Sequence, residues 1–446
     1  MELDCRDPEQ RMARLSPWKR GRSESWGPYR TSRYSFAEKF DTNTDSNIDL
    51  DLDIKKLSLK VSPFVVSLVS LTGEKPLFMG SGTITESEEV NGTYFGTILT
   101  SASLLRTSAE SDAIPDDIKV NVHLRDGTLC EGQVLAYDWH YNIAWIKIKS
   151  DAPLATASLR LLDDTMCVDP SGMQDKELGS NSFQLHPHSD FFKLCPGDMV
   201  VAVGRYFQPP NEIMAAPGRF SIDCCDFDCK ELFRGNCKIS KVCGIGGPLI
   251  NRHGEVIGVN FYDKLCTPFL PINIASKCLE HFNKYGRFSR PLLGMEMTNL
   301  YATSLRNLDR INLKFPNDSN GVFVEKVIEG SHAECAGILS GDVIVQCAGN
   351  FVRSVLEFYG ISWDKCGESV EVVVLRSRTG DRLNLTLKVG ETSSDKINRR
   401  MFQSQSRNNV HFAGNVDGMP ADALLSRSFD SGTCFPIMVG CQGIFA

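Results

Sequence analysis

The densest group of reactive side chains in the sequence is a set of four cysteines within residues 223–237, namely Cys224, Cys225, Cys229 and Cys237. Thiolates are ligands of structural zinc and the reactive groups of redox enzymes. The spacing here is irregular, since two cysteines are adjacent and no second C-x-x-C pair follows. Because neighbouring side chains of a strand point to opposite faces, the four could not share one ion. We therefore expect buried reduced thiols, no metal and no cofactor.

Four short segments stand out along the chain: 80–84 (GSGTI), 99–105 (LTSASLL), 142–148 (NIAWIKI) and 244–251 (GIGGPLIN). In order and spacing they resemble the successive motifs of trypsin-like serine proteases. Together with DGTLCEGQVLAYD, CPGDMVVAVGRYF and NRHGEVIGVNFYD, they resemble more narrowly the Deg/HtrA (protease Do-like) family. The resemblance extends over residues 61–389 and implies serine-type endopeptidase chemistry.

That chemistry needs a serine nucleophile, a histidine base and an acid that orients the histidine. The family motif T-x-x-H corresponds to residues 100–103, so the base position is Ser103. The motif D-[IL]-A-x-[LI]-K corresponds to 142–147, so the acid position is Asn142. The motif G-N-S-G-G-P-L corresponds to 243–249, so the nucleophile position is Ile245. The resemblance therefore implies a degenerate triad in which no catalytic residue is intact.

Neighbouring residues offer no substitute triad. His123 lies in a strand-like setting, and His140, two residues before Asn142, is expected to face solvent. Cys243 lies two residues before the nucleophile position without an evident base, and we interpret it as a small buried side chain. We expect the turn at Gly246 and Gly247 to keep backbone N–H groups directed into the place of an oxyanion hole, which alone does not hydrolyse peptides.

The elements that must position these residues are mainly β. Short strand-like runs separated by turns fill residues 61–149 and resume at 198, as in an all-β sandwich or barrel. A helix is expected from Ile274 to Tyr285, ending near Gly286. With the resemblance, this predicts a two-barrel trypsin-like domain followed by a PDZ-like α+β domain. The expected divisions are a disordered N-terminal arm (1–57), the protease-fold domain (58–289), the PDZ-like domain (290–390) and a largely disordered tail (391–446).

The PDZ-like domain implies a peptide site. PDZ domains bind an extended peptide along a sheet edge. By resemblance, Leu292, Leu293, Gly294 and Met295 form the loop that receives a C-terminal carboxylate, while Val355 and Tyr359 line the side-chain pocket together with Leu356. A purely structural domain, in which the apolar loop packs into the core, is the alternative that the sequence leaves open.

Three functional hypotheses follow from these residues. The first is a catalytically inactive pseudoprotease that binds peptides or proteins, as a homo-oligomer or as a hetero-oligomer with Deg-type relatives. The second, which family membership alone implies, is an active serine endopeptidase. The third is a decayed gene copy. Ser103, Asn142 and Ile245 favour the first hypothesis over the second.

Composition limits the remaining classes of function. The chain has 446 residues, with 48 basic and 55 acidic side chains and a net charge of −7, so it lacks the positive field of a general nucleic-acid-binding protein. No apolar run is long enough to span a bilayer, and the N-terminus lacks the apolar region of a signal peptide. We therefore expect no nucleic-acid or membrane partner, and a cytoplasmic or nuclear protein with reduced thiols.

Overall fold

The computed structural model describes residues 50–107, 113–168, 191–208, 210–222, 229, 231–239, 243–263 and 265–392. Most of the predicted N-terminal arm, nearly all of the predicted tail, and Cys224 and Cys225 lie outside these residues. Among the described residues, no helix is long and apolar enough to cross a membrane.

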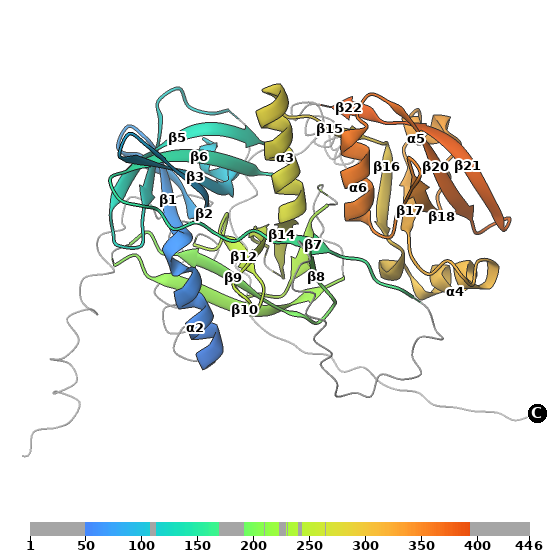
Figure 1. Cartoon of the computed structure of the whole chain (residues 1–446), viewed down its shortest axis with the longest axis horizontal. Coiled ribbons are helices and arrows are strands. Elements are labelled where there is room, and N and C mark those ends of the chain that lie inside the picture. The colour runs from blue at the N-terminus through green and yellow to red at the C-terminus, as the bar shows by residue number, and fades with distance from the viewer. Residues whose placement is uncertain are drawn as a thin grey trace, which may run out of the picture. The chain divides into compact units, whose positions relative to one another are not determined.

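The first barrel is closed by six antiparallel strands in the order β1-β2-β3-β6-β5-β4 (Figure 1). Their interior is built from β-branched and aromatic residues, which favour strands. Gly132 lies where the wall is tightest, because a Cβ there would approach the Ile146 side chain to 2.6 Å. The strands are β1 (Val65–Thr72), β2 (Lys75–Val90), β3 (Thr93–Ser101), β4 (Ile118–His123), β5 (Leu129–Asp138) and β6 (Ile143–Ser150).

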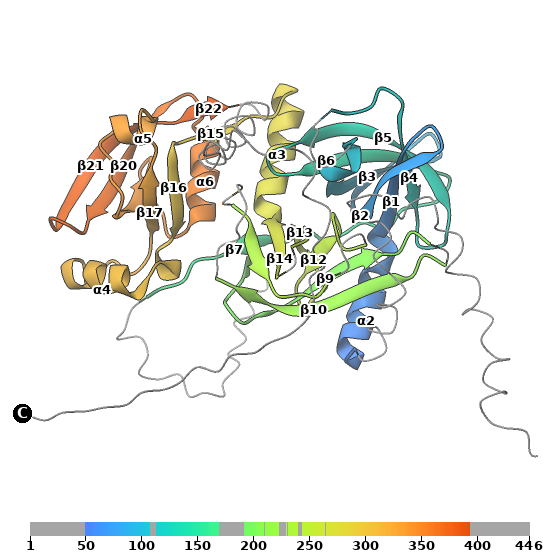
Figure 2. The same ribbon diagram turned by 180° about the vertical axis from the view of Figure 1, so that it is seen from behind.

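A second closed barrel has the strand order β10-β11-β14-β13-β12-β9, and Figure 2 shows its strand β13 from behind. The rings of Phe220, Phe233 and Phe269 pack against one another inside it, with centroids 5.7 to 6.3 Å apart. The strands are β9 (Met199–Arg205), β10 (Ile213–Ser221), β11 (Phe233–Gly235), β12 (Pro248–Ile250), β13 (Val256–Asn260) and β14 (Thr267–Pro271). The expected mainly β, two-barrel trypsin-like fold is thus confirmed.

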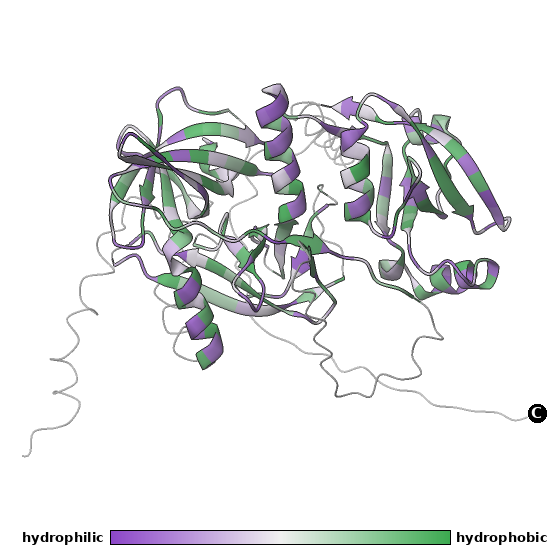
Figure 3. Cartoon of the chain, viewed as in Figure 1, coloured by the Kyte–Doolittle hydropathy of each residue, from purple (hydrophilic) through white to green (hydrophobic). Residues whose placement is uncertain are grey.

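Helix α2 (Leu52–Val61) precedes the first barrel and carries both hydrophobic and hydrophilic residues along its length (Figure 3). Its residues Ile54, Leu57 and Val61 are buried in the same core as the barrels. The prediction of a disordered arm is therefore wrong over residues 52–57. The acidic run DLDLD lies beside apolar residues spaced three and four apart, and these form one face of the helix.

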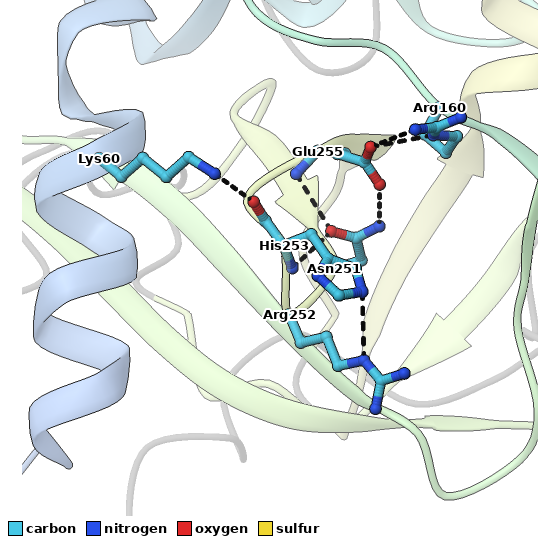
Figure 4. Close-up of polar contacts among 6 residues, drawn as sticks. All are labelled: Lys60, Arg160, Asn251, Arg252, His253 and Glu255. Carbon is cyan, nitrogen blue, oxygen red and sulfur yellow. Dashed lines mark hydrogen bonds and ion pairs between the residues drawn. The ribbon is translucent and has the colours of Figure 1, made fainter. Parts of the chain in front are cut away.

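The β12–β13 turn attaches α2 to the second barrel (Figure 4). Lys60 Nζ donates to the carbonyl of His253 at 2.7 Å. Asn251 Oδ1 accepts from the backbone N–H groups of His253 and Glu255 at 2.9 and 3.1 Å, which fixes the turn. The Glu255 carboxylate in turn accepts from Arg160 Nη2 at 2.6 Å. The turn at Arg252, His253 and Gly254 is thus a fixed junction of three chain segments.

The C-terminal α+β unit follows helix α3 (Ile272–Tyr285), whose C-cap Gly286 has a left-handed φ of +67°. Its main sheet has the order β16-β17-β18-β20-β21, and β19 pairs with β18. The unit has apolar clusters of its own, centred on residues such as Val324, Ile344 and Phe358. Its elements are β15 (Arg290–Leu292), β16 (Met295–Asn299), α4 (Leu305–Lys314), β17 (Val322–Val327), α5 (His332–Cys335), β18 (Asp342–Cys347), β19 (Asn350–Phe351), α6 (Val355–Asp364), β20 (Ser369–Arg376), β21 (Asp381–Lys388) and β22 (Gly390–Thr392).

Buried polar contacts join the α+β unit to the barrels. Arg290 Nη1 donates to both carboxylate oxygens of Asp138 at 3.1 and 3.0 Å. Asn299 Nδ2 donates to Asp164 Oδ2 at 2.8 Å. Burial raises the pKa of Asp164 to about 6, although hydrogen bonds to Ser354 and Asn299 oppose the rise. The described residues of the barrels and of this unit belong to one compact body, so the predicted boundary at residues 289/290 remains a prediction.

Candidate functional site

The end of strand β3 positions Ser103. Ser101 is the last residue of β3, and its Oγ accepts a hydrogen bond from the backbone N–H of Ser103 at 3.2 Å. This bond caps the 3₁₀ turn Ala102–Leu105, as serine side chains do at helix starts. Ser103, which the sequence motif predicts to be the base position, is partly exposed.

Asn142 lies directly against Ser103. Its Nδ2 and Oδ1 atoms are 3.0 and 3.1 Å from Ser103 Oγ. Its backbone has a left-handed φ of +52°, a conformation that asparagine tolerates better than most residues. Its carbonyl also accepts from Ala102 N at 3.0 Å. The predicted base and acid positions are therefore in contact. They carry a neutral hydroxyl and a neutral amide, neither of which takes up a proton near neutral pH.

The loop that carries Ile245 packs against the same end of β3. The Ile245 carbonyl accepts from Ser81 N at 2.8 Å. A Cβ added to Gly246 would lie 2.6 Å from Thr100 Oγ1 and 2.7 Å from Ser101 N, so the two loops are in van der Waals contact. Ile245 itself is partly buried. An isoleucine side chain offers no nucleophile.

The prediction that the N–H groups of Gly246 and Gly247 point into the place of an oxyanion hole is wrong. Gly246 N donates to the carbonyl of Asn260 at 2.8 Å, and Gly247 N donates to Gly244 O at 3.3 Å. Gly246 has a left-handed φ of +77°, which turns its N–H toward β13 instead of the cleft. Both N–H groups thus serve the fold, because buried backbone donors are satisfied internally.

The Cys243 side chain is part of the buried core. It is 2% exposed, and burial raises the pKa of its thiol well above the usual value. Its carbonyl accepts from Ser81 Oγ, and the backbone of Gly204 packs closely on that carbonyl. A buried, protonated thiol is a poor nucleophile, so Cys243 does not replace the missing serine.

His140 does not face solvent, contrary to the expectation from its polar turn. Its side chain is 8% exposed, and its Nε2 lies 3.8 Å from Glu231 Oε2. The ring also packs edge-on against Tyr141, with centroids 4.7 Å apart. Glu231 comes from a segment about 90 residues later in the chain, so only the folded arrangement of the two barrels brings the pair together.

The residues predicted for peptide binding lie on β15, on the loop between β15 and β16, at the start of β16 and on α6. Leu292 is 38% exposed and pairs with Gly390, whereas Leu293 and Met295 are buried in the core of the α+β unit. Gly294 has a left-handed φ of +77°, and a Cβ there would come within 2.2 Å of Ser331 Cβ. The loop is therefore shaped by glycine and by close packing on Ser331.

The groove between β16 and α6 is covered by the second barrel. Only about 60 Å³ of cavity remains between them, which is far too little for an extended peptide. Val355 and Leu356 of α6 are nearly fully buried, and Tyr359 is partly buried. The lining residues are Met297 and Thr298 of β16, Val355, Leu356 and Tyr359 of α6, and Phe220, Leu232 and Phe233 of the barrel.

A larger cavity of 530 Å³ lies between α3, β7 (Leu161–Asp163) and α6. Among its charged lining residues, Lys277 bonds to Asp364 at 2.8 Å, and Arg353 bonds to Glu357. The lining also includes the carboxylates Asp163, Asp164 and Glu280.

Comparison with known proteins places these features in context. The model of the trypsin-like peptidase domain matches residues 80–259. Protease Do-like 14 of Arabidopsis thaliana is 32% identical over 359 residues, which are 77% of this chain and 72% of the relative. Serine protease HhoB of Synechocystis is 26% identical over 67% of this chain and 64% of its own length. The solved structure of the HtrA-type protease AlgW with a tripeptide is 20% identical, covers 76% of this chain and 97% of its own, and has a TM-score of 0.48.

Proposed function

We propose that this chain, which belongs to the Deg/HtrA (protease Do-like) family of trypsin-like serine proteases, is a pseudoprotease. It has lost peptide hydrolysis and acts as a protein- or peptide-binding module on a protease scaffold. The observation that carries this proposal is the set of side chains at the three triad positions, Ser103, Asn142 and Ile245. Removal of the whole triad leaves at best the small residual rate that binding alone provides.

Incubation of the wild-type protein with an unfolded protein substrate tests the proposal. We expect no cleavage above the buffer blank, and we expect Ser103→Ala to leave that result unchanged, since Ser103 takes up no proton. Trypsin under the same conditions is the positive control. Cleavage that co-purifies with the wild-type chain and stops with a serine-directed inhibitor would instead support the active endopeptidase that family membership alone implies.

The binding function is assigned to the α+β unit, whose strand–helix groove resembles that of a PDZ domain. Its carboxylate loop is Leu292, Leu293, Gly294 and Met295, and its side-chain pocket is formed by Val355 and Tyr359. These features need none of the missing catalytic groups. Since the second barrel covers the groove, a peptide gains access only after α6 separates from the barrel. The resting protein is therefore in a closed state.

Trp363 is the contact whose loss should open the groove. It is 4% exposed in the barrel-side core, and its Nε1 donates to Ser289 O at 2.9 Å. We expect Trp363→Ala to raise the affinity of the full chain for peptides with a free apolar C-terminus roughly tenfold or more, because apparent affinity scales with the open fraction. Fluorescence anisotropy of labelled peptides measures this change.

Two controls accompany that measurement. Leu305→Ala changes an 80% exposed residue of α4 and should behave as the wild type. The same peptides with an amidated C-terminus should bind neither protein. Equal binding of free and amidated peptides, or no binding by Trp363→Ala, would leave the α+β unit with a structural role alone.

The wider setting of this function follows from the same proposal. The partners are proteins or peptides, including Deg-type relatives with which the chain would form homo- or hetero-oligomers. The buried reduced thiols of Cys130, Cys229, Cys237, Cys278 and Cys347 are consistent with a reducing compartment, cytoplasmic or nuclear. Affinity capture from native extract, followed by size-exclusion chromatography, tests both points.

A further inference from the structure

Three potential metal ligands from separate parts of the chain meet beside the degenerate cleft. His140 lies in the turn between β5 and β6 of the first barrel, while Cys229 and Glu231 lie just before β11 of the second barrel. Their ligand atoms all lie within 4.8 Å of one another. The side chains of His140 and Glu231 are only 8% and 11% exposed, and Cys229 is 8% exposed.

Two of the distances within this cluster are close to those around a tetrahedral ion. Zinc binds sulfur at about 2.3 Å and nitrogen or oxygen at about 2.0–2.2 Å, so ligand atoms on a tetrahedron lie about 3.3–3.6 Å apart. Here Cys229 Sγ is 3.3 Å from Glu231 Oε2, and His140 Nε2 is 3.8 Å from the same oxygen. The second distance is longer than a hydrogen bond. A small inward shift would complete one face of the tetrahedron.

The burial of Glu231 also suits a cation. Its carboxylate is largely withdrawn from water and lies among nitrogen and sulfur donors. A buried carboxylate is costly unless it is paired or coordinates a metal.

A fourth ligand position is available next to the cluster. Of the three residues, Glu231 lines the 60 Å³ cavity between the second barrel and α6, together with Tyr359, and a cavity of that size holds a water molecule. Three protein ligands with a water in the fourth position form a familiar zinc coordination. The mixture of nitrogen, sulfur and oxygen donors also favours zinc over the hard cations magnesium and calcium.

We propose that His140, Cys229 and Glu231 bind one Zn²⁺ ion, with water as the fourth ligand. Binding replaces the thiol proton of Cys229, which passes to solvent, and neutralises the buried Glu231 carboxylate. The ion links two segments of the chain beside Tyr359 of α6. One is the β5–β6 turn, which carries Asn142, and the other is the segment before β11 of the second barrel. It therefore stabilises the closed arrangement of the groove without taking part in hydrolysis.

The test uses the untagged full chain, stripped with a chelator under reducing conditions and titrated with Co²⁺ as a spectroscopic substitute for zinc. We expect one ion per chain, visible d–d bands of a tetrahedral site and a near-ultraviolet thiolate-to-cobalt band. Cys229→Ser should abolish the thiolate band. Glu231→Gln and His140→Ala should weaken Co²⁺ binding by roughly tenfold or more.

Cys237→Ser is the matched control, because Cys237 is a buried thiol of the same barrel, 5% exposed, outside the cluster. It should keep the full cobalt spectrum. Thermal unfolding shows whether each variant is folded. Zinc should raise the melting temperature of the wild type and not that of Cys229→Ser. A wild-type chain without a thiolate band, or a band that survives Cys229→Ser, overturns the proposal.

Discussion

Truncation of Arg290 to alanine is expected to lower the free energy of unfolding by about 3–5 kcal/mol, because it leaves a buried carboxylate without its counter-charge. Arg290 and Asp138 have side chains that are 4% and 2% exposed and lie 3.0 Å apart. The Arg290 guanidinium also lies over the ring of Tyr141, 5.2 Å from its centroid. Arg290 begins β15, and Asp138 ends β5, so the pair joins the α+β unit to the first barrel. Chemical denaturation of both proteins measures the loss.

A double-mutant cycle separates the ion pair from lost packing. Asp138→Asn in the Arg290→Ala background should recover part of the stability, because the uncompensated charge is then gone. Lys365→Ala provides the surface control, since its pair with Glu368 has a similar length of 2.9 Å but is largely exposed. That change should leave the free energy of unfolding nearly unchanged. Equal losses for Arg290→Ala and Lys365→Ala would show that the buried pair does not hold the unit in place.

Restoring all three triad residues is expected to produce measurable hydrolysis where single restorations do not. Ser103→His and Asn142→Asp would place an imidazole beside a carboxylate at positions that already touch, and aspartate tolerates the left-handed backbone at residue 142. Ile245→Ser would then supply the nucleophile. We expect the triple variant to hydrolyse an activated ester substrate roughly 10²–10⁴-fold faster than Ile245→Ser alone, the contribution of a positioned general base.

Cys243→Ser in the wild-type background is the matched control for that series. Its side chain is buried two residues before the nucleophile position, so the new hydroxyl should give no activity. A triple variant no faster than Ile245→Ser would show that the cleft no longer holds the geometry of a protease. The paired N–H groups of Gly246 and Gly247 limit the rate, because they do not stabilise an oxyanion.

The sequence motifs predict much of this fold, because each motif forms a strand or turn with a local signature. The helix that ends before Gly286 follows from capping chemistry, and the strand-like runs between turns follow from turn chemistry. Helix α2 is harder to recognise, since Ile54 and Leu57 lie among aspartates and lysines that mask the apolar face. Its helical state depends on burial against the barrels more than on its own propensity.

Some residues of the candidate sites could be predicted from the sequence, and others are brought together only by the fold. Short motifs predict Ser103 and Asn142 as the base and acid positions, and the two side chains are in contact. The buried position of His140 could not be predicted, because Glu231 and Cys229 approach it only when the two barrels pack together. The paired state of Gly246 N depends on Asn260 in a strand that follows later. The cover over the α6 groove likewise depends on Phe220 and Phe233, whose sequence context indicates barrel strands and nothing more.

Labelling of the native wild-type protein with a fluorophosphonate probe tests the central claim most directly. Such probes react with a serine only when a base and an oxyanion site activate it. With Ser103, Asn142 and Ile245 at the triad positions, we predict no adduct by intact mass spectrometry, before or after heat denaturation. A stoichiometric adduct that maps to residues 243–249 or 100–103 and disappears on denaturation would contradict the assignment of this chain as a pseudoprotease.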